Sequence, residues 1–115
     1  GAITFYESEL RMANSAIIKA RCEDALNTVR TTFELRRCYI GDAFSDAFDA
    51  DFCKGSIHHS RFERSGNDGL ALSGSTITIR DCYVSNCGDK GISAGEASDV
   101  SVFGIEIRTA NIGMA

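Results

Sequence analysis

The chain has 115 residues, the length of one domain, and 43% of them are hydrophobic, which is enough for a buried core. The net charge of −4 at pH 7 and the lack of a basic run argue against binding to a nucleic-acid backbone. No apolar stretch reaches the length of a membrane span, and the opening GAITFYESEL has no signal-peptide pattern, although this does not fix the compartment.

The first segment, residues 7–20, allows two interpretations. Its apolar residues fit an amphipathic helix, but they also fit short strands of a degenerate first copy of a repeat. We favour the repeat, because the same spacing of residue types continues through the rest of the chain. Proline is absent and there are 11 glycines, a composition typical of stacked parallel strands joined by short turns.

An internal repeat is indicated by columns of equivalent positions that keep their chemical type from copy to copy at a constant spacing. Three adjacent columns are Asp24, Asp46, Asp68, Lys90 and Ile112; Ala25, Ala47, Gly69, Gly91 and Gly113; and Leu26, Phe48, Leu70, Ile92 and Met114. Three more are Ala13, Leu35, Ile57 and Ile79; Ala16, Cys38, Ser60 and Cys82; and Ile18, Ile40, Phe62 and Val84. The fifth copy continues the apolar columns one residue late, with Val102, Ile105 and Ile107. We therefore expect an inserted residue at 97–101 and one residue fewer before Ile112.

Within each copy the apolar residues alternate with polar ones, as in TITIRDCYV from Thr76 to Val84. This alternation predicts strands, with bends at Arg80–Asp81 and at Phe103–Gly104. A copy of this size buries its apolar face only by stacking on the next copy, about 4.8 Å away. The sequence thus predicts an all-β parallel solenoid of about five rungs, forming one domain over residues 1–115, with Leu26, Phe48, Leu70, Ile92 and Met114 as one buried stack.

The I-x-I-x-x-C-x-V rhythm and the segments DGLAL and KGISA resemble the right-handed parallel β-helix family, the pectate-lyase-like fold. The resemblance implies a right-handed solenoid. GNDGLALSGS and GDKGISAGEAS are also similar to β-helix modules of large bacterial surface or secreted proteins, some joined to CotH-type kinase domains. That likeness implies a structural or carbohydrate-facing module at the cell surface or outside the cell, with a cytoplasmic location left open. Lys90, Gly91, Ser93, Gly95 and Glu96 would then form its most distinctive patch.

The chain stops inside an apolar segment, NIGMA, and neither end has the polar character of a solenoid cap. We expect either the flanking rungs of a longer chain or end-to-end association with another copy.

Of the five cysteines, Cys38 and Cys82 share a column but are two rungs apart, about 9–10 Å, too far for a disulfide. Cys22, Cys53 and Cys87 form no CxxC pair with them, and we predict no disulfide and no zinc site.

The acidic column Asp24, Asp46 and Asp68 has three interpretations. Each Asp precedes a strand and would accept hydrogen bonds from the backbone of its own turn. Alternatively, the stacked carboxylates would bind Ca²⁺, or one of them would hold a proton for acid–base catalysis. Because Lys90 continues the column, we favour turn capping.

Asp49 and Asp51 point outward from the middle of a strand, where a side chain does not cap a turn. We interpret this surface first as a solvated face and second as a face that binds a sugar or a metal, with Lys90 and Glu96 as further ligand-binding candidates. A second outward column, Arg36, His58 and Arg80, would suit an acidic sugar or serve as plain surface charge.

Two functional hypotheses follow. The first is a non-catalytic structural or ligand-presenting module, with carbohydrate as its ligand. The second is a polysaccharide lyase or glycoside hydrolase that acts on an acidic polysaccharide in a groove lined by Asp49, Asp51, Asp68 and Lys90. The chain resembles the polygalacturonase-like branch at Asp68 alone, because the adjacent Asp pair is missing and no His precedes Gly91.

Overall fold

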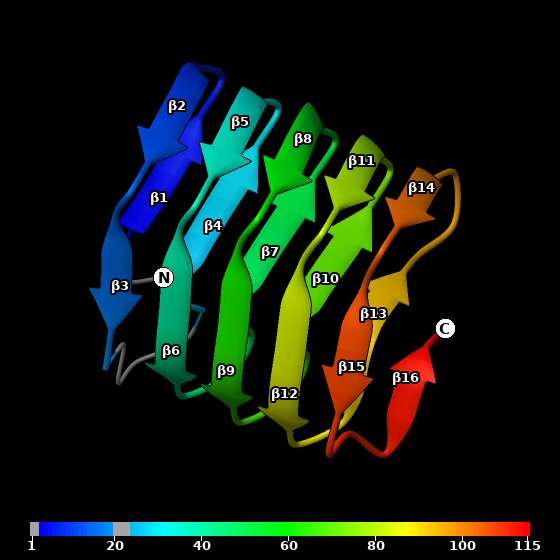
Figure 1. The fold of residues 1–115 in the computed structure, drawn as a ribbon. Coiled ribbons are helices and arrows are strands. Elements are labelled where there is room, and N and C mark those ends of the chain that lie inside the picture. The colour runs from blue at the N-terminus through cyan, green and yellow to red at the C-terminus, as the bar shows by residue number, and fades with distance from the viewer. Residues whose placement is uncertain (1–2, 20–23) are drawn as a thin grey trace.

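The computed structural model describes residues 3–19 and 24–115, which form sixteen short strands (Figure 1). Their bounds are β1 (Ile3–Tyr6), β2 (Glu9–Ala13), β3 (Ala16–Ile18), β4 (Leu26–Val29), β5 (Thr32–Arg36), β6 (Tyr39–Ala43), β7 (Phe48–Asp51), β8 (Lys54–His58), β9 (Arg61–Ser65), β10 (Leu70–Ser73), β11 (Thr76–Arg80), β12 (Tyr83–Cys87), β13 (Lys90–Ala94), β14 (Asp99–Phe103), β15 (Glu106–Arg108) and β16 (Ile112–Met114).

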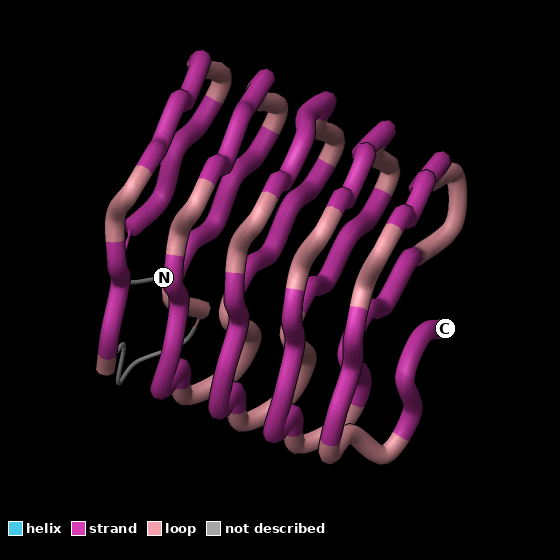
Figure 2. Tube along the Cα trace, in the orientation of Figure 1, coloured by secondary structure: helices cyan, strands magenta, loops and turns pink. Residues whose placement is uncertain are grey.

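Every third strand belongs to the same sheet, and all pairs are parallel. Sheet A has the order β1-β4-β7-β10-β13-β16, sheet B β14-β11-β8-β5-β2, and sheet C β15-β12-β9-β6-β3. Figure 2 shows the chain passing through the three sheets in turn and then repeating the path one rung further on. The structure is therefore an all-β parallel solenoid, as the repeat predicted. The segment 7–19 forms strands of a first rung, so the helical alternative is wrong there.

Each rung has three residues of positive φ. Two of them lie in the turns between strands, in the columns Glu7, Arg30, Phe52, Gly74 and Ala97, and Asn14, Arg37, His59, Asp81 and Gly104. The third lies in or just after the strand of sheet C, in the column Lys19, Asp42, Arg64, Asn86 and Thr109. The left-handed conformation costs a non-glycine residue about 1–2 kcal/mol. Backbone hydrogen bonds between rungs offset this cost, since His59 N–H donates to Arg80 O at 3.0 Å and Arg37 N–H to His58 O at 3.0 Å. The bends predicted near Asp81 and Gly104 are confirmed.

The strand pairing confirms the columns from the second rung onward and corrects the first rung. Leu35 pairs with Met12, not with Ala13, and Ile40 pairs with Ile17, not with Ile18. By the same register Ser15, not Ala16, lies beside Cys38. The step from Ile18 to its partner Gly41 is one residue longer than the step from Leu26 to Phe48, so one extra residue lies between Ile18 and Leu26.

The predicted insertion in the fifth copy is confirmed. Leu72 pairs with Ala94, whereas Thr76 pairs with Asp99, a step that is one residue longer. The extra residue lies in the turn between β13 and β14. The shorter step returns where Lys90 pairs with Ile112. The strands thus keep their register because the turn absorbs the change in length.

The core is a continuous column of apolar side chains between the three sheets. Leu26, Phe48, Leu70 and Ile92 are at most 2% exposed, and the ring of Phe33 meets Phe48 edge to face at 5.2 Å. Met114 continues the register but is 54% exposed, because β16 pairs on one side only. The prediction that Met114 is buried with the others is wrong. An adjoining rung or a second copy beyond this strand stays a prediction.

Cys38, Cys53, Cys82 and Cys87 are free thiols buried inside the solenoid, where they act as small core residues. Burial raises the pKa of the Cys82 and Cys87 thiols, which makes them poor nucleophiles at neutral pH. Cys22 lies outside the described residues. Across residues 3–19 and 24–115, no helix is long and apolar enough to cross a membrane.

Candidate functional site

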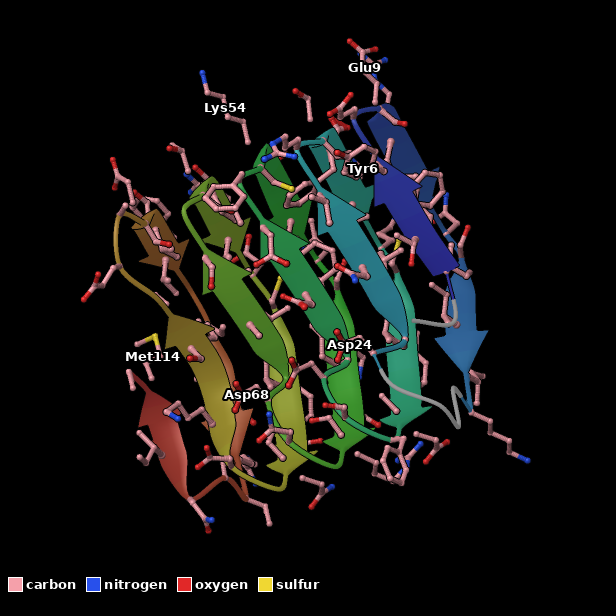
Figure 3. The ribbon with its side chains drawn as sticks, turned by 180° about the vertical axis from the view of Figure 1, so that it is seen from behind. Tyr6, Glu9, Asp24, Lys54, Asp68 and Met114 are labelled. Atoms are coloured by element: carbon pink, nitrogen blue, oxygen red, sulfur yellow. The ribbon has the colours of Figure 1, made fainter. Side chains whose placement is uncertain are left out.

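Four aspartates gather on the outer face of sheet A, and we call Asp24, Asp46, Asp49 and Asp51 the acidic cluster. Strand alternation explains its middle part, since Phe48 and Ala50 of β7 are fully buried and Asp49 and Asp51 face outward. The other two aspartates precede β4 and β7 by two residues each. Figure 3 shows Asp24 and Asp68 at the starts of β4 and β10, in one row along the solenoid.

Three of these carboxyl groups lie close enough to share one ligand. Each of Asp24, Asp46 and Asp49 offers an oxygen, and the three atoms lie within 4.8 Å of one another. Asp24 and Asp46 come from neighbouring rungs of one column, and Asp49 comes from the strand beside them. The structure therefore brings the aspartates predicted to bind a metal next to the strand predicted to bind a ligand. In the sequence these residues belong to different columns of the repeat.

Ionisation of all the carboxyl groups of the acidic cluster at once is strongly unfavourable. Burial is the main cause that raises the pKa of Asp49 to about 8; a hydrogen bond with Asp24 and the charges of Asp51, Asp24 and Asp46 add to it. Burial likewise raises the pKa of Asp46 to about 6, although hydrogen bonds from Asp68 and Asn67 oppose the shift. The pKa of Asp51 is also raised, by burial and by the charge of Asp24. At neutral pH the cluster holds a proton unless a cation replaces it.

The acidic column also caps backbone, but across rungs and not within one turn. Oδ1 of Asp24 accepts from Asp46 N–H at 3.0 Å, and Oδ1 of Asp46 accepts from Asp68 N–H at 2.9 Å. Oδ1 of Asp68 accepts from Lys90 N–H at 3.0 Å. The capping interpretation correctly predicted that backbone N–H groups are the donors. It was wrong to place them in the same turn as each aspartate, since each donor lies one rung further along.

Asp68 adjoins the acidic cluster through its N–H, which donates to Asp46, whereas its carboxylate accepts from Lys90 on the next rung. Asp68 is 7% exposed, and the Lys90 ammonium pairs with Asp89 at 3.0 Å. Glu96 is exposed in the turn after β13. The structure thus brings Asp49 and Asp51 together with Asp24 and Asp46, while Asp68, Lys90 and Glu96 lie further along the solenoid.

Sequence reasoning missed two features beside the cluster. Asn27 pairs with Asp49 across β4 and β7, and its buried Oδ1 has no hydrogen-bond partner. Phe44 and Phe52, at the corners on either side of β7, are 68% and 62% exposed. A signal for the phenylalanines existed, because Gly66 and Gly74 hold the matching positions one rung later.

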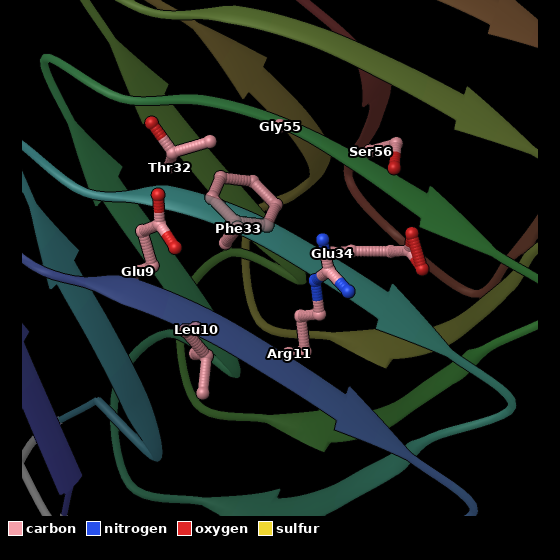
Figure 4. A pocket seen from close by; sticks show the side chains of 8 residues that line it. All are labelled: Glu9, Leu10, Arg11, Thr32, Phe33, Glu34, Gly55 and Ser56. Atoms are coloured by element: carbon pink, nitrogen blue, oxygen red, sulfur yellow. The ribbon is translucent and has the colours of Figure 1, made fainter.

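The basic column lies on sheet B, away from the acidic cluster. Arg36 pairs with Glu34 at 3.8 Å, and the Arg80 guanidinium lies 4.4 Å from the centroid of the Phe103 ring. Sheet B also carries a shallow pocket of about 230 Å³ (Figure 4). Its lining consists of Glu9, Leu10, Arg11, Thr32, Phe33, Glu34, Gly55 and Ser56, and no residue predicted for a site is among them.

Comparison with known proteins agrees with this architecture. The family described as "Right handed beta helix region" matches residues 25–114. A search of curated proteins returned no match. The matched range includes every rung from β4 onward and contains Asp46, Asp49 and Asp51. Because this match covers more than half of the sequence, the chain belongs to the right-handed β-helix family.

Proposed function

We propose that this chain is a non-catalytic β-helix module that presents a Ca²⁺-supported carbohydrate-binding surface, at the cell surface or outside the cell. The observation that carries the proposal is the convergence of Asp24, Asp46 and Asp49 oxygens within 4.8 Å on the outer face of sheet A. The parallel pairing of β4 with β7 places these oxygens on adjacent rungs.

The residues present fit a calcium ion. Ca²⁺ takes six to eight oxygen ligands in flexible geometry, and carboxylates and amide carbonyls are its usual protein donors. The three carboxyl groups supply such oxygens, and Asn27 Oδ1, which has no partner, lies on the strand that pairs with Asp49. A bound cation would offset the burial and the neighbouring negative charges that raise the pKa of Asp49. It would also leave coordination positions open to sugar hydroxyls.

The same geometry argues for binding over catalysis. A lyase needs a base in its neutral form close to the metal-bound sugar, and among the described residues no Lys or Arg forms an ion pair with the acidic cluster. Lys90, the candidate base, is engaged by Asp89. Within residues 3–19 and 24–115, the cluster therefore offers ligand oxygens without an ion-paired Lys or Arg for proton abstraction.

Calorimetric titration of the protein with CaCl₂ and with MgCl₂ tests the cation. We expect Ca²⁺ to bind more tightly than Mg²⁺, since Mg²⁺ demands near-octahedral geometry. At a Ca²⁺ concentration about 100 times the dissociation constant, the folded state gains about 2.7 kcal/mol. The Asp49→Asn variant should lose this gain, and the Asp99→Asn control, an exposed carboxylate on sheet B, should keep it. Equal calcium binding by both variants would contradict the proposal.

One observation favours glycoside hydrolysis as a second candidate. Asp49, with a pKa raised to about 8, stays protonated at neutral pH beside other carboxylates, and such pairs of acid and carboxylate cleave glycosidic bonds. Incubation with polysaccharides, followed by assays for reducing ends and for unsaturated products, decides this point. Reducing ends that depend on Asp49 would establish a hydrolase in place of a binding module.

A further inference from the structure

Exposed large hydrophobic side chains occur at only two places in the interior rungs that the structure describes. Ile3, Tyr6 and Ile18 belong to the first rung, and Phe103, Ile112 and Met114 lie on the end strands of sheets B and A. Phe44 and Phe52 are the two that remain, and they are more exposed than any of the others. Both lie on the third rung, one on each side of β7. Incomplete stacking therefore explains the other six but not this pair.

Glycine holds the position beside each phenylalanine on the following rung. A Cβ added at Gly74 would come within 2.6 Å of the Phe52 ring, and Gly74 itself has a φ of +57°. A Cβ added at Gly66 would collide with the carbonyl oxygen of Phe44. On the other side of Phe52, the Arg30 guanidinium lies over the ring at 5.7 Å from its centroid, and Phe52 as a whole is 62% exposed.

Along the chain, Phe44 and Phe52 lie on either side of three aspartates of the acidic cluster, in the order Phe44, Asp46, Asp49, Asp51, Phe52, and Asp24 belongs to the rung before. Eight residue steps separate Phe44 from Phe52, which sets an upper limit of about 29 Å between their Cα atoms in extended chain. Aromatic rings beside hydrogen-bonding oxygens suit pyranose rings, because a sugar has an apolar face for stacking and hydroxyl groups at its rim.

The negative charge of this surface determines whether it binds neutral or acidic sugars. The cluster has four carboxyl groups, and one divalent cation balances the charge of only two carboxylates. Among the described residues, the ion pairs of Arg64, Lys90 and Arg108 all lie elsewhere, and the Arg30 guanidinium beside Phe52 adds a single positive charge. A uronate or sulfate group would therefore meet net repulsion, whereas neutral hydroxyls would donate to the carboxylates.

We propose that the outer face of β7 binds a neutral oligosaccharide that lies along the strand, with sugar rings stacked on Phe44 and Phe52 and hydroxyls directed at the acidic cluster. This inference rests on the proposed carbohydrate-binding function and makes it specific. The ligand then runs across the solenoid axis, parallel to the strands, and its length is set by the distance between the two rings.

Calorimetric titration of the intact chain in the presence of CaCl₂ tests the inference, with cello-, xylo- and manno-oligosaccharides against oligogalacturonate and alginate oligomers. We expect a neutral series to bind and to gain affinity with length until both rings are covered. Phe44→Ala and Phe52→Ala should each weaken this binding about five- to tenfold, and Phe52→Tyr, which keeps the ring, should restore it. Phe103→Ala is the matched control, since that ring is also exposed and lies under an arginine, but on sheet B.

The outcomes separate this inference from the function on which it rests. Binding of acidic oligomers alone would overturn the neutral ligand and leave the carbohydrate-binding module intact. Calcium binding without any sugar binding would overturn both the neutral ligand and the carbohydrate function. Neutral binding that Phe44→Ala and Phe52→Ala leave unchanged would overturn the stacking. Loss of a dimer in these variants on size-exclusion chromatography, without any change in sugar affinity, would assign the two rings to self-association instead.

Discussion

Replacing Asp49 with asparagine should make the protein more stable at high pH. The pKa of Asp49 is raised from 3.8 to about 8 in the folded protein, mainly by burial and by the neighbouring aspartates. The folded state therefore holds this proton more tightly than the unfolded chain does. Its stabilising effect is complete below about pH 4 and is lost as the pH rises through about 8. Asparagine resembles the protonated carboxyl group and does not ionise, so the variant avoids this loss.

The size of the effect follows from the shift. Four pKa units correspond to about 5–6 kcal/mol as an upper limit. Asp49 is only partly buried, and solvent screens its charge, so we reduce the figure to about 2–3 kcal/mol. At pH 9 the Asp49→Asn variant should exceed the wild type by that amount. At pH 5, where the folded wild type keeps the proton, the difference should fall below about 1 kcal/mol.

Urea unfolding followed by circular dichroism at pH 5 and pH 9, with EGTA to remove calcium, measures this difference. The wild type should lose stability between the two pH values, and the Asp49→Asn variant should lose less. Asp99→Asn controls for general loss of negative charge, since Asp99 is exposed on sheet B. Equal stability of wild type and Asp49→Asn at both pH values would show that Asp49 ionises as an isolated surface carboxylate. A variant that is less stable at pH 9 would refute the reasoning altogether.

Two further substitutions test the register. Phe48→Asp places an unpaired charge in the column between Leu26 and Leu70 and should prevent folding, which the circular dichroism spectrum would show; a folded variant would contradict the buried stack. Asp68→Ala leaves the Lys90 N–H without its acceptor and should lower the free energy of unfolding in urea by about 1–2 kcal/mol, whereas Asp68→Asn, which keeps an acceptor oxygen, should lose less.

Most of the fold could be predicted from the sequence because, in a solenoid, residues that contact one another recur at a constant spacing along the chain. Residues one period apart become neighbours in adjacent strands, so the column Leu26, Phe48, Leu70 and Ile92 is visible in the sequence alone. The inserted residue of the fifth copy was also visible, since the columns of Val102, Ile105 and Ile107 shifted together before the frame returned at Ile112. A change in turn length moves the frame without changing the residue types that face inward.

The first rung shows the limit of this reasoning. Ile17 and Ile18 are identical residues, and Met12 and Ala13 are both apolar, so a register one residue off still places hydrophobic residues in the core columns. Strand pairing decides the matter, because it leaves Ile18 53% exposed and places Ile17 against the core. The repeat spacing locates each rung along the chain. It does not decide which of two adjacent residues faces the core when both are apolar.

The acidic cluster could not be predicted as a unit because it forms between columns and not within one. The column of Asp24 and Asp46 alone only caps backbone, as Asp68 does one rung later. Asp49 makes the difference, and the residue that pairs with it on the next rung is Ala71. The carboxyl groups therefore converge only where the two columns are acidic on the same rung. That rung also carries Phe44 and Phe52, whose corner positions become glycines one rung later. A regular solenoid thus acquires one distinct surface through substitutions in columns that elsewhere serve structure.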